Sequence, residues 1–201
     1  ARFAQENHLA ALQPVFPAVT MPVQATMLTG SLPSAHGCLS NTRFDRKGLT
    51  YNSWEQSARL LDESPFWSKS WFAAKSAATI CWQFSFHNGA DQVITPAPSH
   101  TPDGKTFSAI MTVPPALCEK LEAKAGSFPL SNYWGPMADI KSTKWIVTAA
   151  EVVAGEYSPD VALVYLPHLD YVFQRHSFYD EAVKHELNLF ADELERLLAL
   201  A

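Results

Sequence analysis

The sequence has no excess of positive charge and no long hydrophobic run. Its 201 residues include 15 Lys and Arg against 20 Asp and Glu, a formal net charge of −5. Proteins that bind the nucleic-acid backbone need a basic surface, so nucleic acid is not an expected partner. No stretch approaches the roughly 18 consecutive apolar residues of a membrane-spanning helix, so no membrane partner is expected either.

Cysteine is scarce as well. Cys38, Cys81 and Cys118 lie far apart and form neither a CxxC pair nor a metal-ligand spacing. An odd number of scattered cysteines is typical of reduced thiols, which favours a cytoplasmic location, and no signal peptide is recognisable. The chain begins and stops inside apparent helices, at Ala1 and Ala201, so we expect a partial domain truncated at both ends.

Hydrophobic residues make up 47% of the chain, which is enough to bury a core and excludes intrinsic disorder. Strands are predicted over residues 9–16, 78–86 and 160–167, and helices over residues 1–7, 20–29, 51–61, 115–125, 142–155 and from 179 onward. This alternation predicts the α/β class and a single domain over residues 1–201. Residues 89–133 are rich in Pro and Gly and lack a core of their own, so we interpret them as an insertion or lid.

The stretch FPAVTMPVQATMLTG places a threonine where a helix begins. Pro17 ends any preceding helix, Thr20 is a good N-cap, and Gly30 is a natural C-cap. Backbone N–H groups and the positive end of the helix dipole make such a terminus a ready phosphate site. The Thr20 hydroxyl can attack phosphorus there if a metal ion lowers its pKa. Alternatively, Thr20 only caps the helix, which is worth about 1 kcal/mol.

A second polar segment, His168-Leu169-Asp170, follows the apolar run DVALVYLP. Unbroken apolar runs are typical of strands covered on both faces of a parallel sheet, and ligands bind beyond the carboxyl ends of such strands. Asp170 is a candidate ligand for a hard metal or zinc, with His168, Gln174 and His176 nearby. Alternatively, Asp170 is a helix cap or salt-bridge residue beside surface histidines.

Together, these segments resemble the nucleotide pyrophosphatase/phosphodiesterase branch of the alkaline phosphatase superfamily, in particular its uncharacterised bacterial members. FPAVTMPVQATMLTGSLPSAHG resembles the nucleophile segment of that branch, and PDVALVYLPHLDYVFQRH resembles its second metal-ligand strand. TPAPSHTPDGK and GSFPLSNYWGPMADIKSTKWI, between them, are similar to the same branch. The resemblance implies an alkaline-phosphatase-like core with a mainly parallel sheet between helices.

The resemblance also implies a site. Thr20 matches a nucleophile that forms a phospho-enzyme and contacts one of two divalent metal ions, zinc in the first place and manganese or magnesium as alternatives. Asp170 matches a ligand of the other ion. Gln174 stands where the branch usually has histidine, and His176 is a possible substitute ligand out of the usual register.

Two functions follow as hypotheses. The first is a metal-dependent hydrolase of phosphodiester, pyrophosphate or phosphonate bonds, acting through Thr20 on a small phosphoester or nucleotide-like substrate. The second is a catalytically impaired homologue that binds a phosphorylated metabolite or serves a biosynthetic accessory role. Gln174 motivates the second hypothesis, because a neutral amide is a poor zinc ligand.

Overall fold

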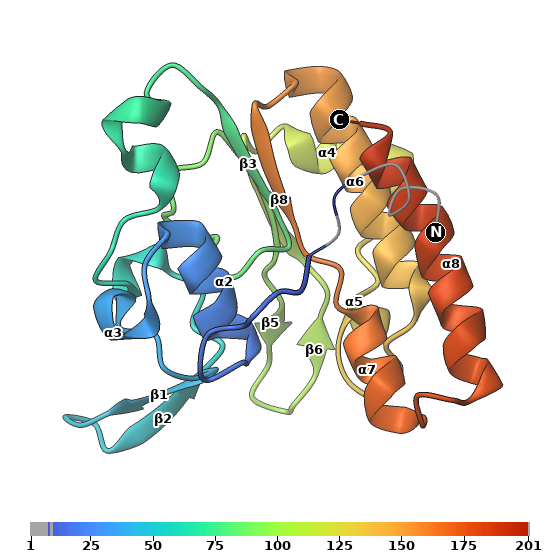
Figure 1. Ribbon diagram of the computed structural model, residues 1–201, viewed down its shortest axis with the longest axis horizontal. Coiled ribbons are helices and arrows are strands. Elements are labelled where there is room, and N and C mark those ends of the chain that lie inside the picture. Colours follow the sequence, from blue (N-terminus) through green and yellow to red (C-terminus); the bar gives the residue numbers. More distant parts are fainter. Residues whose placement is uncertain (1–7, 9, 201) are drawn as a thin grey trace.

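The computed structural model describes residue 8 and residues 10–200, and a four-stranded sheet lies at its centre (Figure 1). The strands are β3 (Ala77–Ile80), β4 (Gln92–Pro96), β7 (Ile110–Val113) and β8 (Val161–Val164), in the order β7-β4-β3-β8. β3 is parallel to both β4 and β8, whereas β7 is antiparallel to β4. The sheet is therefore mainly parallel, as predicted.

The two central strands are apolar on both sides, and helices cover both faces of the sheet. Every residue of β3 and β4 is buried. Ile80 and Ile94 belong to a hydrophobic core on one face of the sheet. Ala77 and Val93, at odd-numbered separations from them along the same strands, belong to a second core on the other face. This alternation follows from the two-residue period of a strand.

The first core lies beneath helices from the second half of the chain (Figure 1). These helices are α4 (Leu117–Ala125), α5 (Leu130–Tyr133), α6 (Ile140–Tyr157), α7 (His168–Arg175) and α8 (Glu181–Leu198). α6 buries Trp145, Ile146 and Ala149 at three-to-four-residue spacing, as an amphipathic helix should. α8 packs against α6, so α6 lies between the sheet and the outermost helix.

The second core lies beneath α2 (Thr20–Thr29), which buries Met21, Ala25 and Leu28. α2 ends at Gly30, whose φ of +71° is the left-handed conformation that glycine adopts without strain. The short α3 (Pro33–His36) follows α2. Three 3₁₀ helices complete this side, at Ala58–Leu60, Phe66–Ser68 and Ser70–Phe72.

Two small hairpins extend beyond the central sheet. One pairs β1 (Thr42–Asp45) with β2 (Thr50–Ser53), and the other pairs β5 (Ser99–His100) with β6 (Thr106–Phe107). Figure 1 shows both hairpins on the side of the molecule where β3 and β8 end. They therefore border the region in which an α/β protein binds its ligands.

The α/β class and the predicted α2, α4, α6 and α8 are confirmed, but four local predictions are wrong. The strand predicted over residues 78–86 ends at Ile80. Residues 10–16, all described, form neither helix nor strand, because Pro14 has no N–H to donate to a sheet. Residues 51–61 form no α-helix, because they contain part of strand β2 and only one 3₁₀ turn, Ala58–Leu60. Tyr51 instead pairs across the β1–β2 hairpin with Phe44, with ring centroids 5.0 Å apart, and such cross-strand pairs stabilise strands. β8 is parallel, as predicted, but only partly buried. The helix predicted over residues 1–7 lies outside the described residues.

The segment interpreted as a lid, residues 89–133, contributes β4 and β7 to the central sheet and α4 to its cover. Only the β5–β6 hairpin within it stands apart from the sheet. The lid prediction therefore applies only to the β5–β6 hairpin, because a buried strand cannot move as a lid. Among the described residues, no helix combines the length and apolarity needed to cross a membrane.

Candidate functional site

Thr20 and Asp170 lie at the same edge of the fold, although they are far apart in the sequence. α2 begins with Thr20, and Asp170 lies in the first turn of α7, shortly after β8 ends. Tyr165 links them: the Thr20 hydroxyl and the charge of Asp170 both act on the pKa of its phenol. Its backbone N–H donates to the carbonyl of Ile80, which extends the β3–β8 pairing to this point. This edge is formed by the carboxyl ends of β3 and β8.

Thr20 is not the N-cap of α2. The cap position is Val19, and no side chain caps the helix there, so the capping interpretation of Thr20 is wrong by one residue. Thr20 is the first residue of the helix and is partly exposed. Its hydroxyl is therefore free of a capping role, and it lies beside the backbone N–H groups at the positive end of α2.

Asn41 is a site residue that the sequence analysis missed. Its Oδ1 accepts a hydrogen bond of 2.9 Å from the backbone N–H of Met21, the residue after Thr20. This bond brings the Asn41 side chain to the first turn of α2, where its NH₂ group is a neutral donor. An isolated loop asparagine twenty residues from Met21 in the chain gives no local sequence signal.

Tyr165 was also missed, because it belongs to the apolar run that predicts a strand. Burial raises the pKa of Tyr165 to about 12, and the nearby Thr20 hydroxyl partly opposes that increase. Its phenol is therefore neutral at pH 7. A neutral phenol can both donate and accept, so Tyr165 can orient the Thr20 hydroxyl without adding charge to the site.

The structure brings Asp170 and Gln174 together but not His176. Gln174 Nε2 donates a 3.0 Å hydrogen bond to Asp170 Oδ2, across one turn of α7. His176 follows the end of α7, and its Nδ1 lies 3.7 Å from Asp180 Oδ2. His168, the other candidate nearby, is fully buried. Of the sequence candidates, Thr20, Asp170 and Gln174 therefore share one edge.

This donor set does not fit a two-metal centre by itself. Within the part of the chain that the structure describes, no group of three or more His, Cys, Asp and Glu side chains could hold a metal ion. Catalytic zinc usually takes three protein ligands, whereas Thr20, Asp170 and Gln174 offer a single anionic group. Two divalent ions at this edge therefore remain a prediction from the family resemblance.

An aromatic pocket of about 560 Å³ reaches α7 at Tyr171. It is lined by Trp54 after β2, Phe86 after β3, Trp134 after α5 and Tyr171, the neighbour of Asp170, with His100 of the β5–β6 hairpin at its margin. No Lys, Arg, Asp or Glu side chain lines it. Its volume and apolar walls are typical of small-molecule sites, and its walls favour an uncharged, flat group.

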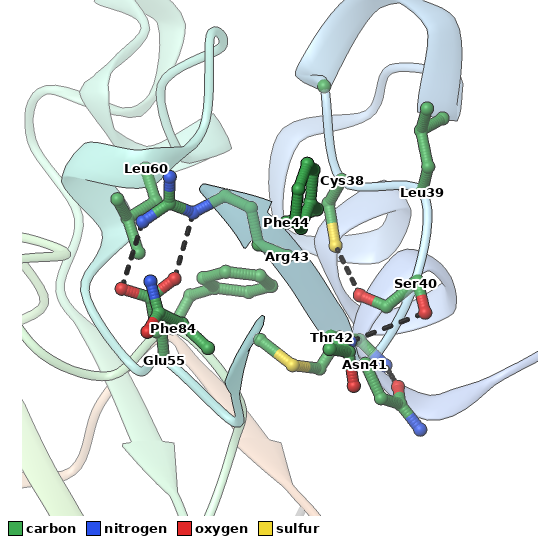
Figure 2. A pocket seen from close by; sticks show the side chains of 13 residues that line it. Cys38, Leu39, Ser40, Asn41, Thr42, Arg43, Phe44, Glu55, Leu60 and Phe84 are labelled. Atoms are coloured by element: carbon green, nitrogen blue, oxygen red, sulfur yellow. Dashed lines mark hydrogen bonds and ion pairs between the residues drawn. The ribbon is translucent and has the colours of Figure 1, made fainter. Parts of the chain in front are cut away.

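A second, smaller pocket of about 200 Å³ lies between α2 and the β1–β2 hairpin (Figure 2). Figure 2 shows the Arg43 guanidinium paired with the Glu55 carboxylate at its wall, with N–O distances of 2.8 and 3.0 Å, and the rings of Phe44 and Phe84 lining it. Because Glu55 neutralises Arg43, this pocket is a poor phosphate site. Its apolar residues hold the hairpin against the start of α2.

Comparison with known proteins gives one family and one fold. The family model "Type I phosphodiesterase / nucleotide pyrophosphatase" matches residues 1–201. Two solved structures of phosphonoacetate hydrolase from Sinorhizobium meliloti 1021, in complex with phosphonoacetate and with phosphonoformate, are each 15% identical, with TM-scores of 0.58 and 0.57. Each match covers 94% of this chain and 44% of the hydrolase, so the chain spans less than half the length of that enzyme. The search of curated proteins gave no match. The structural likeness confirms the predicted alkaline-phosphatase-like fold.

Proposed function

The chain belongs to the type I phosphodiesterase/nucleotide pyrophosphatase family of the alkaline phosphatase superfamily, and we propose a function from this premise. In this proposal the chain takes part in hydrolysing phosphodiester, pyrophosphate or phosphonate bonds, with Thr20 as the nucleophile. The observation that carries the proposal is the meeting of Thr20, Tyr165 and Asp170 at the carboxyl edge of the sheet. That edge is where α/β folds place their ligands.

In the proposed reaction, Thr20 Oγ1 attacks phosphorus and the P–O(Thr20) bond forms, while the hydroxyl proton passes to solvent and the leaving group departs with the electron pair of its bond to phosphorus. Water then hydrolyses the phosphoryl ester of Thr20, which regenerates the hydroxyl and releases the phosphoryl group as the acid product. Tyr165, whose phenol lies near Thr20, orients the Thr20 hydroxyl. The first N–H groups of α2 and the Asn41 amide favour the negative phosphoryl oxygens, because preorganised donors stabilise developing charge.

We propose that the aromatic pocket receives the organic part of the substrate. Tyr171 directly follows Asp170, so a group held against Tyr171 and Trp134 lies close to the reacting edge. The pocket walls carry no charged side chain, which favours a neutral substituent over a second phosphate there. Small phosphoesters with one neutral organic group are therefore the proposed substrates.

Dependence on divalent metal, with zinc as the first candidate and manganese or magnesium as alternatives, is part of the proposal. It rests on the family, since the described residues supply only one anionic donor at this edge. Metal content should be measured on the protein in its natural full length. Chelation followed by addition of each metal should then restore turnover if the dependence is real.

The test of the nucleophile is Thr20→Ala in the full-length protein, with bis-p-nitrophenyl phosphate as substrate. Removing a nucleophile should lower kcat by about 1,000-fold or more, whereas Thr20→Ser keeps a hydroxyl and should keep part of the rate. Thr148→Val, on the partly exposed side of α6, is the matched control and should be silent. If Thr20→Ala turns over at the parent rate, Thr20 is not the nucleophile.

A second candidate function is binding of a phosphorylated metabolite without hydrolysis. The hydrogen bond between Gln174 and Asp170 favours it, because the amide occupies the carboxylate that would otherwise face a metal. Phosphonoacetate, the ligand in one of the similar structures, is a suitable probe for calorimetry. Binding by a folded protein that shows no turnover with any added metal would favour this function over hydrolysis.

A further inference from the structure

His168 is fully buried and connects three helices. Its Nδ1 lies 2.7 Å from the hydroxyl of Thr143 on α6, which is buried as well. Its Nε2 lies 3.6 Å from Glu186 Oε2 on α8, too far for a hydrogen bond. Neither of these two buried atoms has any hydrogen-bond partner. The Thr143–His168 hydrogen bond therefore joins the first residue of α7 to α6, and on its other side the ring faces α8.

The chemistry of the ring fixes its orientation. With the proton on Nε2, toward the Glu186 carboxylate, Nδ1 accepts from the Thr143 hydroxyl. Phe190 of α8 also contacts the ring, with centroids 5.7 Å apart. The imidazole is therefore held by one hydrogen bond at Nδ1 and by the contact with Phe190, while Nε2 faces Glu186 without a hydrogen bond.

The unpaired Nε2 of His168 lowers stability, and an apolar side chain at this position would not carry that cost. A costly polar arrangement is more easily explained if it fixes an orientation that function needs. Asp170 lies two residues after His168, in the same helical turn. At the other end of α7, Arg175 donates to the carbonyls of Pro136 and Ala138, at 2.6 and 2.9 Å. Both ends of the helix that carries Asp170 are thus tied to the body of the protein.

We propose that His168 is a positioning residue, which fixes the first turn of α7, and with it Asp170, against α6 through the hydrogen bond with Thr143 and against α8 through the contact with Phe190. The inference rests on the proposed function, because Asp170 must act at the Thr20 edge for its position to matter. His168 itself does not touch the substrate in this proposal, since it is fully buried. Its contribution is to hold a neighbouring carboxylate in place.

The test compares two substitutions at Thr143 in the full-length protein. Thr143→Val removes the hydroxyl at nearly constant volume, and Thr143→Ser keeps it. We expect Thr143→Val to lower kcat by about 10-fold to 100-fold with little change in KM, as supporting partners of a site residue do. Thr143→Ser should restore most of kcat, and Thr148→Val, which removes a hydroxyl elsewhere on α6, should leave it unchanged.

Hydrogen exchange supplies a readout besides activity. Amides 169–171 should exchange faster in Thr143→Val than in Thr143→Ser, while those of β3 stay protected. Unchanged kcat and unchanged exchange in Thr143→Val would overturn the proposal, as would an equal loss of kcat in Thr143→Ser. Thr20→Ala, assayed in parallel, separates the two claims. If it retains the parent rate, the proposed function fails; if it is inactive while Thr143→Val keeps its kcat, only the positioning role fails.

Discussion

Asp139 provides a quantitative test of how the helix beneath the site is held. It is the N-cap of α6, where its Oδ1 accepts from the backbone N–H of Lys141 at 2.8 Å. Its Oδ2 accepts from the side-chain amide of Asn132 on α5 at 2.9 Å. Asp139 thus joins two helices that cover the sheet, and α6 carries both a large part of the first core and Thr143.

Asp139→Ala removes both hydrogen bonds. Loss of an N-cap side chain costs about 1 kcal/mol. Loss of the bond to Asn132 costs about 1 kcal/mol more, a value at the low end for a charged acceptor because the Asp139 side chain is 35% exposed. The free energy of unfolding should therefore fall by about 2 kcal/mol. Asp139→Asn keeps a good cap and an acceptor, so it should cost less than about 1 kcal/mol.

Urea denaturation of both variants measures these values. With an m-value of about 2 kcal/mol per molar urea, Asp139→Ala should lower the midpoint by about 1 M. The melting temperature should fall by about 6 °C for a chain of this size. A loss below about 0.5 kcal/mol in Asp139→Ala would refute the stabilising role of these two hydrogen bonds, since surface substitutions without a specific role fall in that range. An equal loss in Asp139→Asn would refute the cap as its cause.

Three further predictions concern pH, the core and the metal. Burial lowers the pKa of His36 below 6.5, so as the pH falls the unfolded chain takes up this proton before the folded chain does. The free energy of unfolding should therefore be highest above pH 7 and fall as the pH drops through about 6.5. A pH-independent urea midpoint between pH 8 and 5.5 would contradict this. Ile146→Ala deletes a fully buried side chain of α6 and should cost about 2–5 kcal/mol by urea denaturation, with a loss under about 1 kcal/mol counting against the first core as described. Gln174→His places an imidazole one turn from Asp170 and should raise the affinity for zinc in a direct titration, and an unchanged affinity would show that the two side chains do not act on one ion.

The sequence predicts those parts of the fold whose signals are local. Gly30 ends α2 because a left-handed residue is needed there, and the periodic apolar positions of α6 and α8 locate both helices. The β1–β2 hairpin was missed because its stability depends on pairing between two segments, such as Tyr51 with Phe44. Periodicity within one segment cannot report that pairing.

The same distinction between local and non-local signals applies to the residues of the candidate site. Thr20 and Asp170 were predicted because each follows a recognisable pattern, a helix start and a strand end. Asn41 and Tyr165 were missed because only folding brings them to Thr20: one lies in a loop, and the other belongs to an apolar run. The aromatic pocket combines side chains from five separate segments, so no local pattern contains it.

The pairing of β3 with β8 also sets the order in which the site can assemble. Ser76, just before β3, donates its backbone N–H to Asp160, just before β8 and 84 residues further along the chain. A chain emerging from the ribosome can form α2, the β1–β2 hairpin and β3 long before β8 has been synthesised. During that interval Thr20 has its helix and Asn41, but neither Tyr165 nor Asp170. The proposed hydrolysis at this edge therefore becomes possible only after β8 has docked. Only chains whose central sheet is already complete can carry it out.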